Sequence, residues 1–403
     1  MPRLRRLLRP IASPEALLLA ATVLLVRWDG LAPWLAAFAR FYPAAVLATG
    51  LALAWRLSRS RLVFALAILG LAATALATVA GAATPGHRVA FQLTALLVPL
   101  NLAAIALVPE RGALTPSGWR RWGALVAQVA LVGIAYERGG AAAAALLRDG
   151  PLPNTWFRWT PLGQPALAAF LLAGAALVLR RLFDAGATGW GREYLWALAA
   201  TLLACTSRDP GRTIYFATAG LILVVGLVEA SHLLAYHDGL TGLPGRRALS
   251  EALERLDGRY TVAMVDVDHF KKLNDAYGHD TGDQVLRMVA ARLREVPAGG
   301  TAYRYGGEEF ALLFSGTPLA GSLPALETLR RAVAGTSFTV RAAVRRRRGK
   351  ASGRTTRSTE ATVTVSIGAA EPDARGPRPI DVVQAADRAL YRAKEGGRNR
   401  VAV

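Results

Sequence analysis

Long apolar runs fill the first 230 residues, and they constrain the fold more than any other feature of the chain. A membrane-spanning helix needs about 20 predominantly apolar residues, within a range of roughly 17–25. The predicted spans, in order of clarity, are 62–83, 89–108, 161–179, 213–230, 122–136, 193–206, 41–55 and 11–26. The sequence therefore predicts a polytopic helical membrane region of about eight spans over residues 1–230.

The composition of the chain agrees with this prediction. The chain is 53% hydrophobic and 19% charged, whereas soluble proteins average about 45–50% apolar and about 25% charged residues. The single cysteine, Cys205, excludes a disulfide framework and a cysteine-rich zinc module. Residues 1–30 also have the basic start and apolar run of a signal peptide, but no small-residue cleavage site follows, so we favour a retained span.

The distribution of arginine predicts the orientation of the membrane region. With the N-terminus inside, the inner segments carry 13 arginines and the outer loops carry eight. Because positive charge accumulates on the cytoplasmic side, this orientation is favoured. An even number of spans then places residues 231–403 in the cytoplasm. The membrane region has few ionisable residues within its spans, which disfavours a transporter and leaves a sensor or a simple anchor. The longest outer loop, residues 137–160, is a candidate ligand site.

Residues 231–403 alternate charged and apolar residues, as a globular domain does. A short apolar run from Tyr260 ends in two acids, Asp266 and Asp268, separated by Val267. Such a run predicts a buried strand, and carboxylates at its end are more typical of a site than of a core. The alternative is a pair of solvated acids at a helix N-terminus, where negative charge is favourable.

Two further segments bring polar groups together after this strand. The first is predicted to form two helices separated by a glycine turn, and it brings Asn274, His279 and Asp283 near one another. A carboxylate and an amide can together recognise a guanine edge. The second is a predicted hairpin whose turn is Gly306-Gly307, followed directly by Glu308 and Glu309. If Glu308 meets Asp266, the two carboxylates can hold Mg²⁺, whereas the alternative is a plain turn with solvated acids.

The pattern Asp-x-Asp-x-Phe-Lys-x-x-Asn-Asp-x-x-Gly-His-x-x-Gly-Asp, followed by Arg-Tyr-Gly-Gly-Glu-Glu-Phe, resembles the GGDEF family of diguanylate cyclases. The signature here is the Gly-Gly-Glu-Glu-Phe variant, at residues 306–310, and the resemblance covers about residues 236–403. It implies an α/β (α+β) fold like that of the polymerase palm and the nucleotide cyclases, with a mostly antiparallel sheet flanked by helices. It also implies that two GTP molecules are condensed into cyclic di-GMP, with release of two pyrophosphates. The membrane region resembles no known sensor module.

The resemblance also implies roles for individual residues. Metal ligands for Mg²⁺, or for Mn²⁺ in its place, are expected at Asp266, the Val267 carbonyl and Glu308. Glu308 is also expected to be the base that helps to deprotonate the ribose 3′-hydroxyl, while Glu309 supports it and Arg304 stabilises charge at the reacting phosphorus. Guanine recognition is expected from Asn274 and Asp283, with His279 close to the substrate. Phosphate ligands are expected at Lys271, Lys394 and Arg398.

A basic segment accounts for the charge of the second region. Residues 341–357 contain eight basic residues and no acid, and the remainder of 231–403 is neutral overall. We favour docking on an anionic lipid surface, where each basic residue contributes about 1 kcal/mol. The alternatives are a solvated loop and nucleic-acid binding. Nucleic acid is disfavoured because no aromatic residue is interleaved with the basic ones after Phe338.

The resemblance leads us to expect a homodimeric enzyme of the bacterial inner membrane, with multiple spans and a cytoplasmic catalytic domain. The symmetric product requires two half-sites, each with one GTP, and a C₂ dimer supplies them. The ligand that signals to the membrane region is unknown. The rival hypothesis is a catalytically silent receptor that binds GTP. Many family members have an inhibitory product site, Arg-x-x-Asp, but Pro297 and Gly300 occupy those two positions here, so this site is expected to be missing.

Overall fold

The computed structural model describes residues 13–28, 30, 32–79, 84–183, 191–256, 258–342, 357–372 and 378–403. The chain divides into two compact units, residues 1–231 and 232–403, and each is described by itself. Of the basic segment 341–357, only residues 341, 342 and 357 lie inside the described range, so its expected docking role falls largely outside the described residues.

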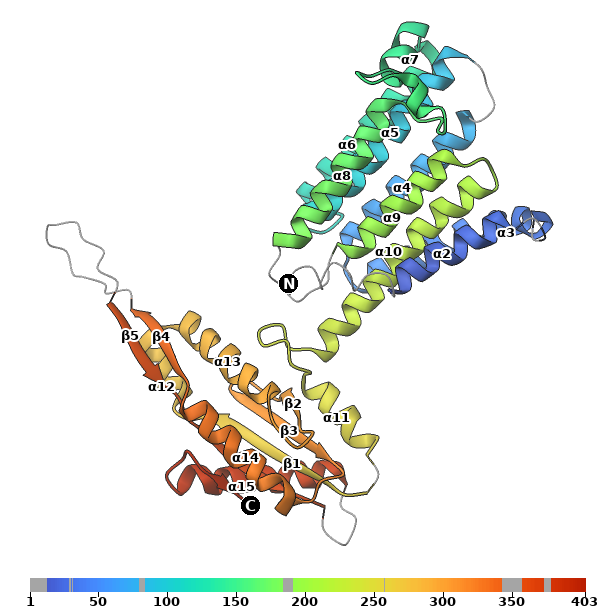
Figure 1. The fold of residues 1–403 in the computed structure, drawn as a ribbon. Coiled ribbons are helices and arrows are strands. Elements are labelled where there is room, and N and C mark those ends of the chain that lie inside the picture. The colour runs from blue at the N-terminus through green and yellow to red at the C-terminus, as the bar shows by residue number, and fades with distance from the viewer. Residues whose placement is uncertain are drawn as a thin grey trace, which may run out of the picture. The chain divides into compact units, whose positions relative to one another are not determined.

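The first unit consists of helices (Figure 1). They are α2 (Pro14–Arg27), α3 (Ala32–Arg56), α4 (Ser60–Val79), α5 (Pro85–Leu107), α6 (Pro116–Arg138), α7 (Ala141–Arg148), the 3₁₀ helix η3 (Asn154–Phe157), α8 (Gln164–Phe183), α9 (Arg192–Thr206) and α10 (Gly211–Tyr236). Each of the eight predicted spans overlaps one helix. Within the described part of the chain, five helices (α3, α4, α5, α8 and α10) are long and apolar enough to cross a membrane. The helices α2 and α9 have only 14 and 15 residues, and α6 has two arginines near its start.

Three of these helices begin with the same local device. Ser13, Thr84 and Thr115 each precede a proline, and each hydroxyl accepts a hydrogen bond from a backbone N–H of the first turn. The hydroxyl satisfies a donor that has no partner inside the helix, and proline has no such donor to lose at the first position. The sequence therefore determines locally where α2, α5 and α6 begin.

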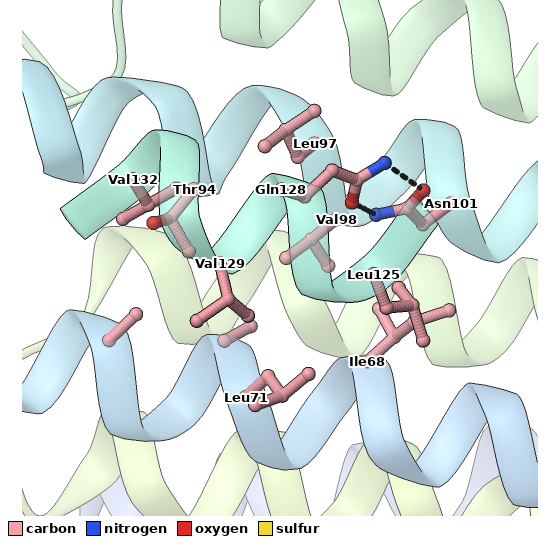
Figure 2. A pocket seen from close by; sticks show the side chains of 12 residues that line it. Ile68, Leu71, Thr94, Leu97, Val98, Asn101, Leu125, Gln128, Val129 and Val132 are labelled. Carbon is pink, nitrogen blue, oxygen red and sulfur yellow. Dashed lines mark hydrogen bonds between the residues drawn. The ribbon is translucent and has the colours of Figure 1, made fainter. Parts of the chain in front are cut away.

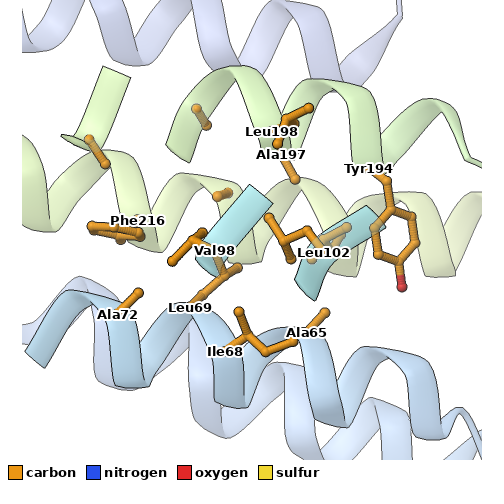
Figure 3. Close-up of a cluster of buried hydrophobic side chains, with 14 of the residues drawn as sticks. Ala65, Ile68, Leu69, Ala72, Val98, Leu102, Tyr194, Ala197, Leu198 and Phe216 are labelled. Carbon is orange, nitrogen blue, oxygen red and sulfur yellow. The ribbon is translucent and has the colours of Figure 1, made fainter. Parts of the chain in front are cut away.

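Small and branched apolar side chains form the core of the first unit (Figure 3). Ile68 and Leu69 of α4 are buried with Val98 of α5 and Ala197 of α9. Alanine lets helix backbones approach closely, which favours packing between helices that lipid surrounds. Aromatic side chains on α3 point outward instead, and Trp55 is 80% exposed. An exposed apolar surface of this kind fits a helix that faces lipid.

Polar side chains inside the apolar bundle satisfy one another. The Asn101 amide of α5 donates to Gln128 Oε1 of α6 at 2.6 Å, and the Gln128 amide donates back to Asn101 Oδ1 at 3.2 Å (Figure 2). Reciprocal bonding removes the cost of burying two amides. The pair therefore sets the register between α5 and α6.

The second unit has a central sheet between helices (Figure 1). Its elements are α11 (Arg246–Glu254), β1 (Tyr260–Val267), α12 (Phe270–Tyr277), α13 (His279–Arg294), β2 (Thr301–Arg304), β3 (Glu309–Ser315), α14 (Leu319–Ala334), β4 (Ser337–Ala342), β5 (Arg357–Thr362), β6 (Val365–Ala370), α15 (Pro379–Glu395) and β7 (Val401–Ala402). The sheet order is β2-β3-β1-β6-β7, and only β6 and β7 pair in parallel. The expected, mostly antiparallel sheet is confirmed. A separate hairpin of β4 and β5 flanks the basic segment.

The central strand β1 is buried on both faces, and the two faces pack against different helices. Ala263 and Val265 contact the core formed with α13 and α14. Val262 and Met264 contact the core formed with α11 and α15. Because side chains alternate along a strand, Asp266 shares the face of Val262 and Met264. The alternation therefore directs the Asp266 carboxylate toward α15.

Candidate functional site

The carboxylates of Asp266 and Glu308 come together at the end of β1, beside the turn that joins β2 to β3. Asp266 pairs with Glu309 in the β1–β3 register, and the next N–H along β1, that of Val267, donates to the Glu308 carbonyl at 3.3 Å. Asp266 is 5% exposed. Within the described residues, no group of three or more His, Cys, Asp or Glu side chains is arranged to hold a metal ion. The residues expected to hold a cation, Asp266, Val267 and Glu308, therefore lie together at the end of β1.

The electrostatics of this pair favour a cation. Burial raises the pKa of Asp266, and the Lys394 ammonium partly offsets this effect. Burial also raises the pKa of Glu308, and the negative charge of Asp266 raises it further. Two poorly hydrated carboxylates that repel each other are stabilised by a divalent cation. Hard oxygen ligands of this kind suit Mg²⁺, which keeps its remaining positions for water and phosphate.

The helix α15 places a lysine directly at the carboxylates. The Lys394 Nζ lies 2.9 Å from Asp266 Oδ2. The close approach of α15 to the sheet depends on Gly368 of β6, because a Cβ at this position would lie 1.9 Å from the Leu390 backbone nitrogen. Arg398 follows α15 and is near enough to lower the pKa of Asp266. Two cationic side chains therefore accompany the acidic pair.

The turn that carries Glu308 is held by backbone bonds and by Arg304. The backbone N–H groups of Tyr305 and Gly306 donate to the Glu309 carbonyl at 2.9 and 3.1 Å. The Arg304 Nε donates to the Gly306 carbonyl at 2.6 Å, and the guanidinium lies over the Phe310 ring, 4.5 Å from its centre. Arg304 is only 8% exposed, and burial lowers its pKa. Its observed contacts position the turn.

The helices α12 and α13 form a second polar cluster. Asn274 Oδ1 is buried and has no hydrogen-bond partner among the described residues. Gly282 makes room for it, because a Cβ at Gly282 would lie 1.9 Å from that oxygen. Asp283 follows Gly282 and stays about half exposed, with Arg287 Nη2 at 4.0 Å. A buried, unsatisfied acceptor is costly unless a ligand completes its bonding, so this cluster has the features of a recognition site.

Of the remaining predicted site residues, Lys271 and His279 are exposed and Glu309 is partly buried. His279 begins α13, and Lys271 lies in the first turn of α12. Glu309 begins β3 and is partly buried. The structure thus brings Asp266, Glu308 and Lys394 together, while Lys271 and His279 make no contact with them that the structure records.

Sequence reasoning missed the role of Asp268. Its carboxylate is 7% exposed and accepts hydrogen bonds from the hydroxyls of Thr364 at 2.6 Å and Ser366 at 2.7 Å, and from the Asn399 N–H at 3.1 Å. It is therefore held inside the fold and is not the solvated acid at a helix N-terminus that the sequence also allowed. The Asp-x-Asp spacing indicated that Asp268 has a role. The residues that bond to it are about 100 or more positions away in the sequence, so the spacing could not identify them.

The second unit is similar to known proteins. Residues 235–400 match a family model described as "Diguanylate cyclase, GGDEF domain". The response regulator PleD of Caulobacter vibrioides is 40% identical over 176 residues, which are 42% of this chain and 36% of that protein. Diguanylate cyclase DgcP of Pseudomonas aeruginosa is 38% identical over 184 residues, which are 44% of this chain and 25% of that protein. The chain thus spans less than half the length of these curated relatives.

A solved structure shares the same region. The coiled coil and GGDEF domain of DgcB from Caulobacter crescentus, solved in complex with c-di-GMP, is 35% identical and has a TM-score of 0.40. The match covers 46% of this chain and 94% of that chain.

Proposed function

We propose, from the premise that residues 235–400 are a GGDEF domain, that this chain is a membrane-bound diguanylate cyclase. The reaction condenses two GTP molecules into cyclic di-GMP and two pyrophosphates. In each half-reaction the 3′-hydroxyl of one GTP attacks the α-phosphorus of the other, and pyrophosphate leaves. The observation that carries the proposal is the approach of Lys394 to Asp266, beside Glu308.

The acidic pair supports the role of Glu308. Asp266, Glu308 and the Val267 carbonyl would hold Mg²⁺ or Mn²⁺, which would neutralise charge on the substrate phosphates. Burial and the neighbouring Asp266 charge raise the pKa of Glu308, and a raised pKa makes a carboxylate a better proton acceptor near neutral pH. We assign Glu308 as the base that takes the proton from the ribose 3′-hydroxyl, and Glu309 as the residue that supports it.

The α12–α13 cluster supports guanine recognition. Asn274 has a buried oxygen without a partner among the described residues, and Asp283 has a half-exposed carboxylate. The carboxylate would accept hydrogen bonds from N1 and N2 of guanine, and adenine has no N2 amino group to offer. His279, exposed at the start of α13, would lie near the bound nucleotide.

Cationic side chains would bind the phosphates. Lys394 and Arg398 flank the acidic pair, and Lys271 lies in the first turn of α12, where helix N–H groups also favour an anion. Arg304 holds the signature turn through its Nε, which donates to the Gly306 carbonyl. Its Nη1 has no hydrogen-bond partner among the described residues and would remain to stabilise charge at the reacting phosphorus.

The membrane region and a homodimer complete the proposal. The apolar helices of the first unit, five of which are long enough to cross a membrane within the described residues, support a multi-span protein of the inner membrane. With the eight predicted spans, an even number, the excess of inner arginines would place the cyclase domain in the cytoplasm. Each subunit would bind one GTP, and two subunits would face each other across a two-fold axis. The membrane region would then control how the two catalytic domains meet.

The test is direct synthesis. The purified full chain, reconstituted in lipid nanodiscs, is incubated with GTP and Mg²⁺, and cyclic di-GMP and pyrophosphate are measured by chromatography. We expect product with GTP and none with ATP. GTP binding without product under dimerising conditions would favour the silent receptor instead.

A further inference from the structure

A cavity at one end of the helical unit is lined by three arginines. Its volume is about 890 Å³, and the ends of α2 and α9 and the starts of α5 and α10 contribute to it. The lining residues are Val26, Arg27, Leu35, Phe91, Pro161, Thr206, Ser207, Arg208, Pro210, Gly211 and Arg212. None of these lining residues is acidic, but Asp209 lies between Arg208 and Pro210 and is ion-paired with Arg212 at 3.4 Å. Three arginines and one acid leave the site with a net positive charge.

Arg212 has a donor that the protein does not use. Arg212 is 8% exposed. Its Nη1 donates to the Leu76 carbonyl at 3.1 Å and to Asp209 Oδ2 at 3.4 Å. Its Nε is buried and has no hydrogen-bond partner among the described residues. A buried guanidinium N–H without an acceptor is costly, and an acceptor brought by a ligand would remove that cost.

Two other features favour an anion at the same place. Arg27 and Arg208 are exposed and lie on the same lining as Arg212. The helix α10 begins at Gly211, which belongs to this lining, so the positive end of the helix dipole lies at the cavity. The backbone N–H groups of Arg212 and Ile214 already donate to the Arg208 and Pro210 carbonyls. Arginine pairs with carboxylates and phosphates through two parallel hydrogen bonds, which suits a fixed site.

We propose that this cavity binds an anionic group, a phosphate or a carboxylate, between α2, α9 and α10. The anion accepts from Arg212 Nε and is enclosed by Arg27 and Arg208. It is supplied either by a small soluble anion or by the headgroup of an anionic lipid. In the proposed orientation the cavity opens on the side of the membrane away from the cytoplasm.

The site is well placed to act on α10. One to two turns below the cavity, Thr218 of α10 bonds to Thr22 of α2 at 3.2 Å and to Tyr42 of α3 at 3.1 Å. These bonds tie three helices together. The helix α10 then continues to Tyr236, so an anion that holds its first turn acts on the helix that leads into the second unit.

Binding is measured on the full chain in nanodiscs, without reference to cyclase activity. One arm uses zwitterionic phosphatidylcholine nanodiscs titrated with inorganic phosphate and with citrate at constant ionic strength. The other arm uses nanodiscs that contain phosphatidylglycerol and no added anion. The readouts are calorimetric affinity for the soluble probes and the thermal unfolding midpoint in both arms.

The variants are Arg27→Gln, Arg208→Gln and Arg212→Gln. Arg27 and Arg208 are exposed, so their variants keep the test valid if Arg212→Gln fails to fold. The control is Arg138→Gln, which removes an exposed charge from the end of α6 outside the cavity. We expect the cavity variants to weaken binding about tenfold or more, and the control to change nothing. A response only to phosphatidylglycerol assigns the lipid source. No response in either arm, or equal losses in Arg138→Gln, overturns the proposal.

Discussion

The Asp268 carboxylate accepts a hydrogen bond from the backbone N–H of Asn399 at 3.1 Å. Asn399 is also held from the other side, because Arg330 Nη1 donates to its side-chain oxygen at 2.5 Å. Arg398 and Asn399 both have positive φ angles, 63° and 45°, which non-glycine residues adopt only at some cost. The two contacts stabilise this turn and so direct Arg398, which makes Asp268 a positioning residue.

We predict that Asp268→Ala destabilises the second unit by about 2–3 kcal/mol, because the hydroxyls of Thr364 and Ser366 and the Asn399 N–H lose their acceptor. The KM for GTP should rise more than kcat falls, since Arg398, which we propose as a phosphate ligand, loses its support. Urea unfolding of the second unit and steady-state kinetics of the full chain test this. Asp275→Ala, an exposed acid on α12, is the control. Equal effects of the two substitutions would contradict the positioning role.

Glu308→Gln should lower turnover by at least about 100-fold, because the amide can neither accept the proton nor hold the cation as a carboxylate does. The free energy of unfolding should change by less than about 0.5 kcal/mol, since the side chain lies at a turn and supports little packing. Product formation and urea unfolding measure the two effects. Wild-type turnover in this variant, or loss of cooperative unfolding, would refute the assignment.

Asp283→Ala should raise the KM for GTP and reduce the preference for GTP over ATP by roughly 10–100-fold, because the N1 and N2 donors of guanine lose their acceptor. Competition between the two nucleotides, followed by equilibrium binding, measures the ratio. Asp280→Ala, an exposed acid in the first turn of the same helix, should leave selectivity unchanged. An unaltered GTP/ATP ratio in Asp283→Ala would remove this residue from the guanine-binding set.

Initial rates should be insensitive to low-micromolar cyclic di-GMP, because the positions of the product-binding arginine and aspartate hold Pro297 and Gly300. The segment forms a turn in which the Gly300 N–H donates to the Pro297 carbonyl at 3.4 Å. A Cβ at Gly300 would lie 2.7 Å from the Phe314 ring, so an aspartate does not fit there. Rate measurements with added product and calorimetry test this. Potent non-competitive inhibition would show that another surface binds the product.

Glu327 should make the stability of the second unit depend on pH in the acid range. Hydrogen bonds from Arg330, and then from Arg331, lower its pKa from 4.5 to about 2. Because folding lowers this pKa, the ionised Glu327 side chain stabilises the folded state. Its contribution to the free energy of unfolding is complete above the ordinary pKa and is lost as the pH falls toward about 2. The side chain is 36% exposed, so we expect less than about 1 kcal/mol. Urea unfolding across this range should show a smaller pH dependence in Glu327→Gln.

Much of the candidate site could be predicted because its signals are local. The apolar run that ends at Asp266 and the Gly306-Gly307 turn before Glu308 predict a strand and a hairpin from neighbouring residues alone. Antiparallel pairing then brings the two acids together. The buried role of Asp268 could not be predicted in this way, since an acid after a strand is equally compatible with solvent, a metal or a buried hydrogen-bond network.

The sequence by itself determined the division of the chain and the apolar helices of the first unit. It also determined that Asp266 ends a strand and that Glu308 follows a turn, because periodicity and turn chemistry act between residues close in the chain. Only the tertiary structure decided which distant groups meet. Asp268 and Asn399 are 131 residues apart, and Arg212 donates to the Leu76 carbonyl across 136 residues. Such contacts depend on how helices and strands pack, and packing is a property of the whole fold.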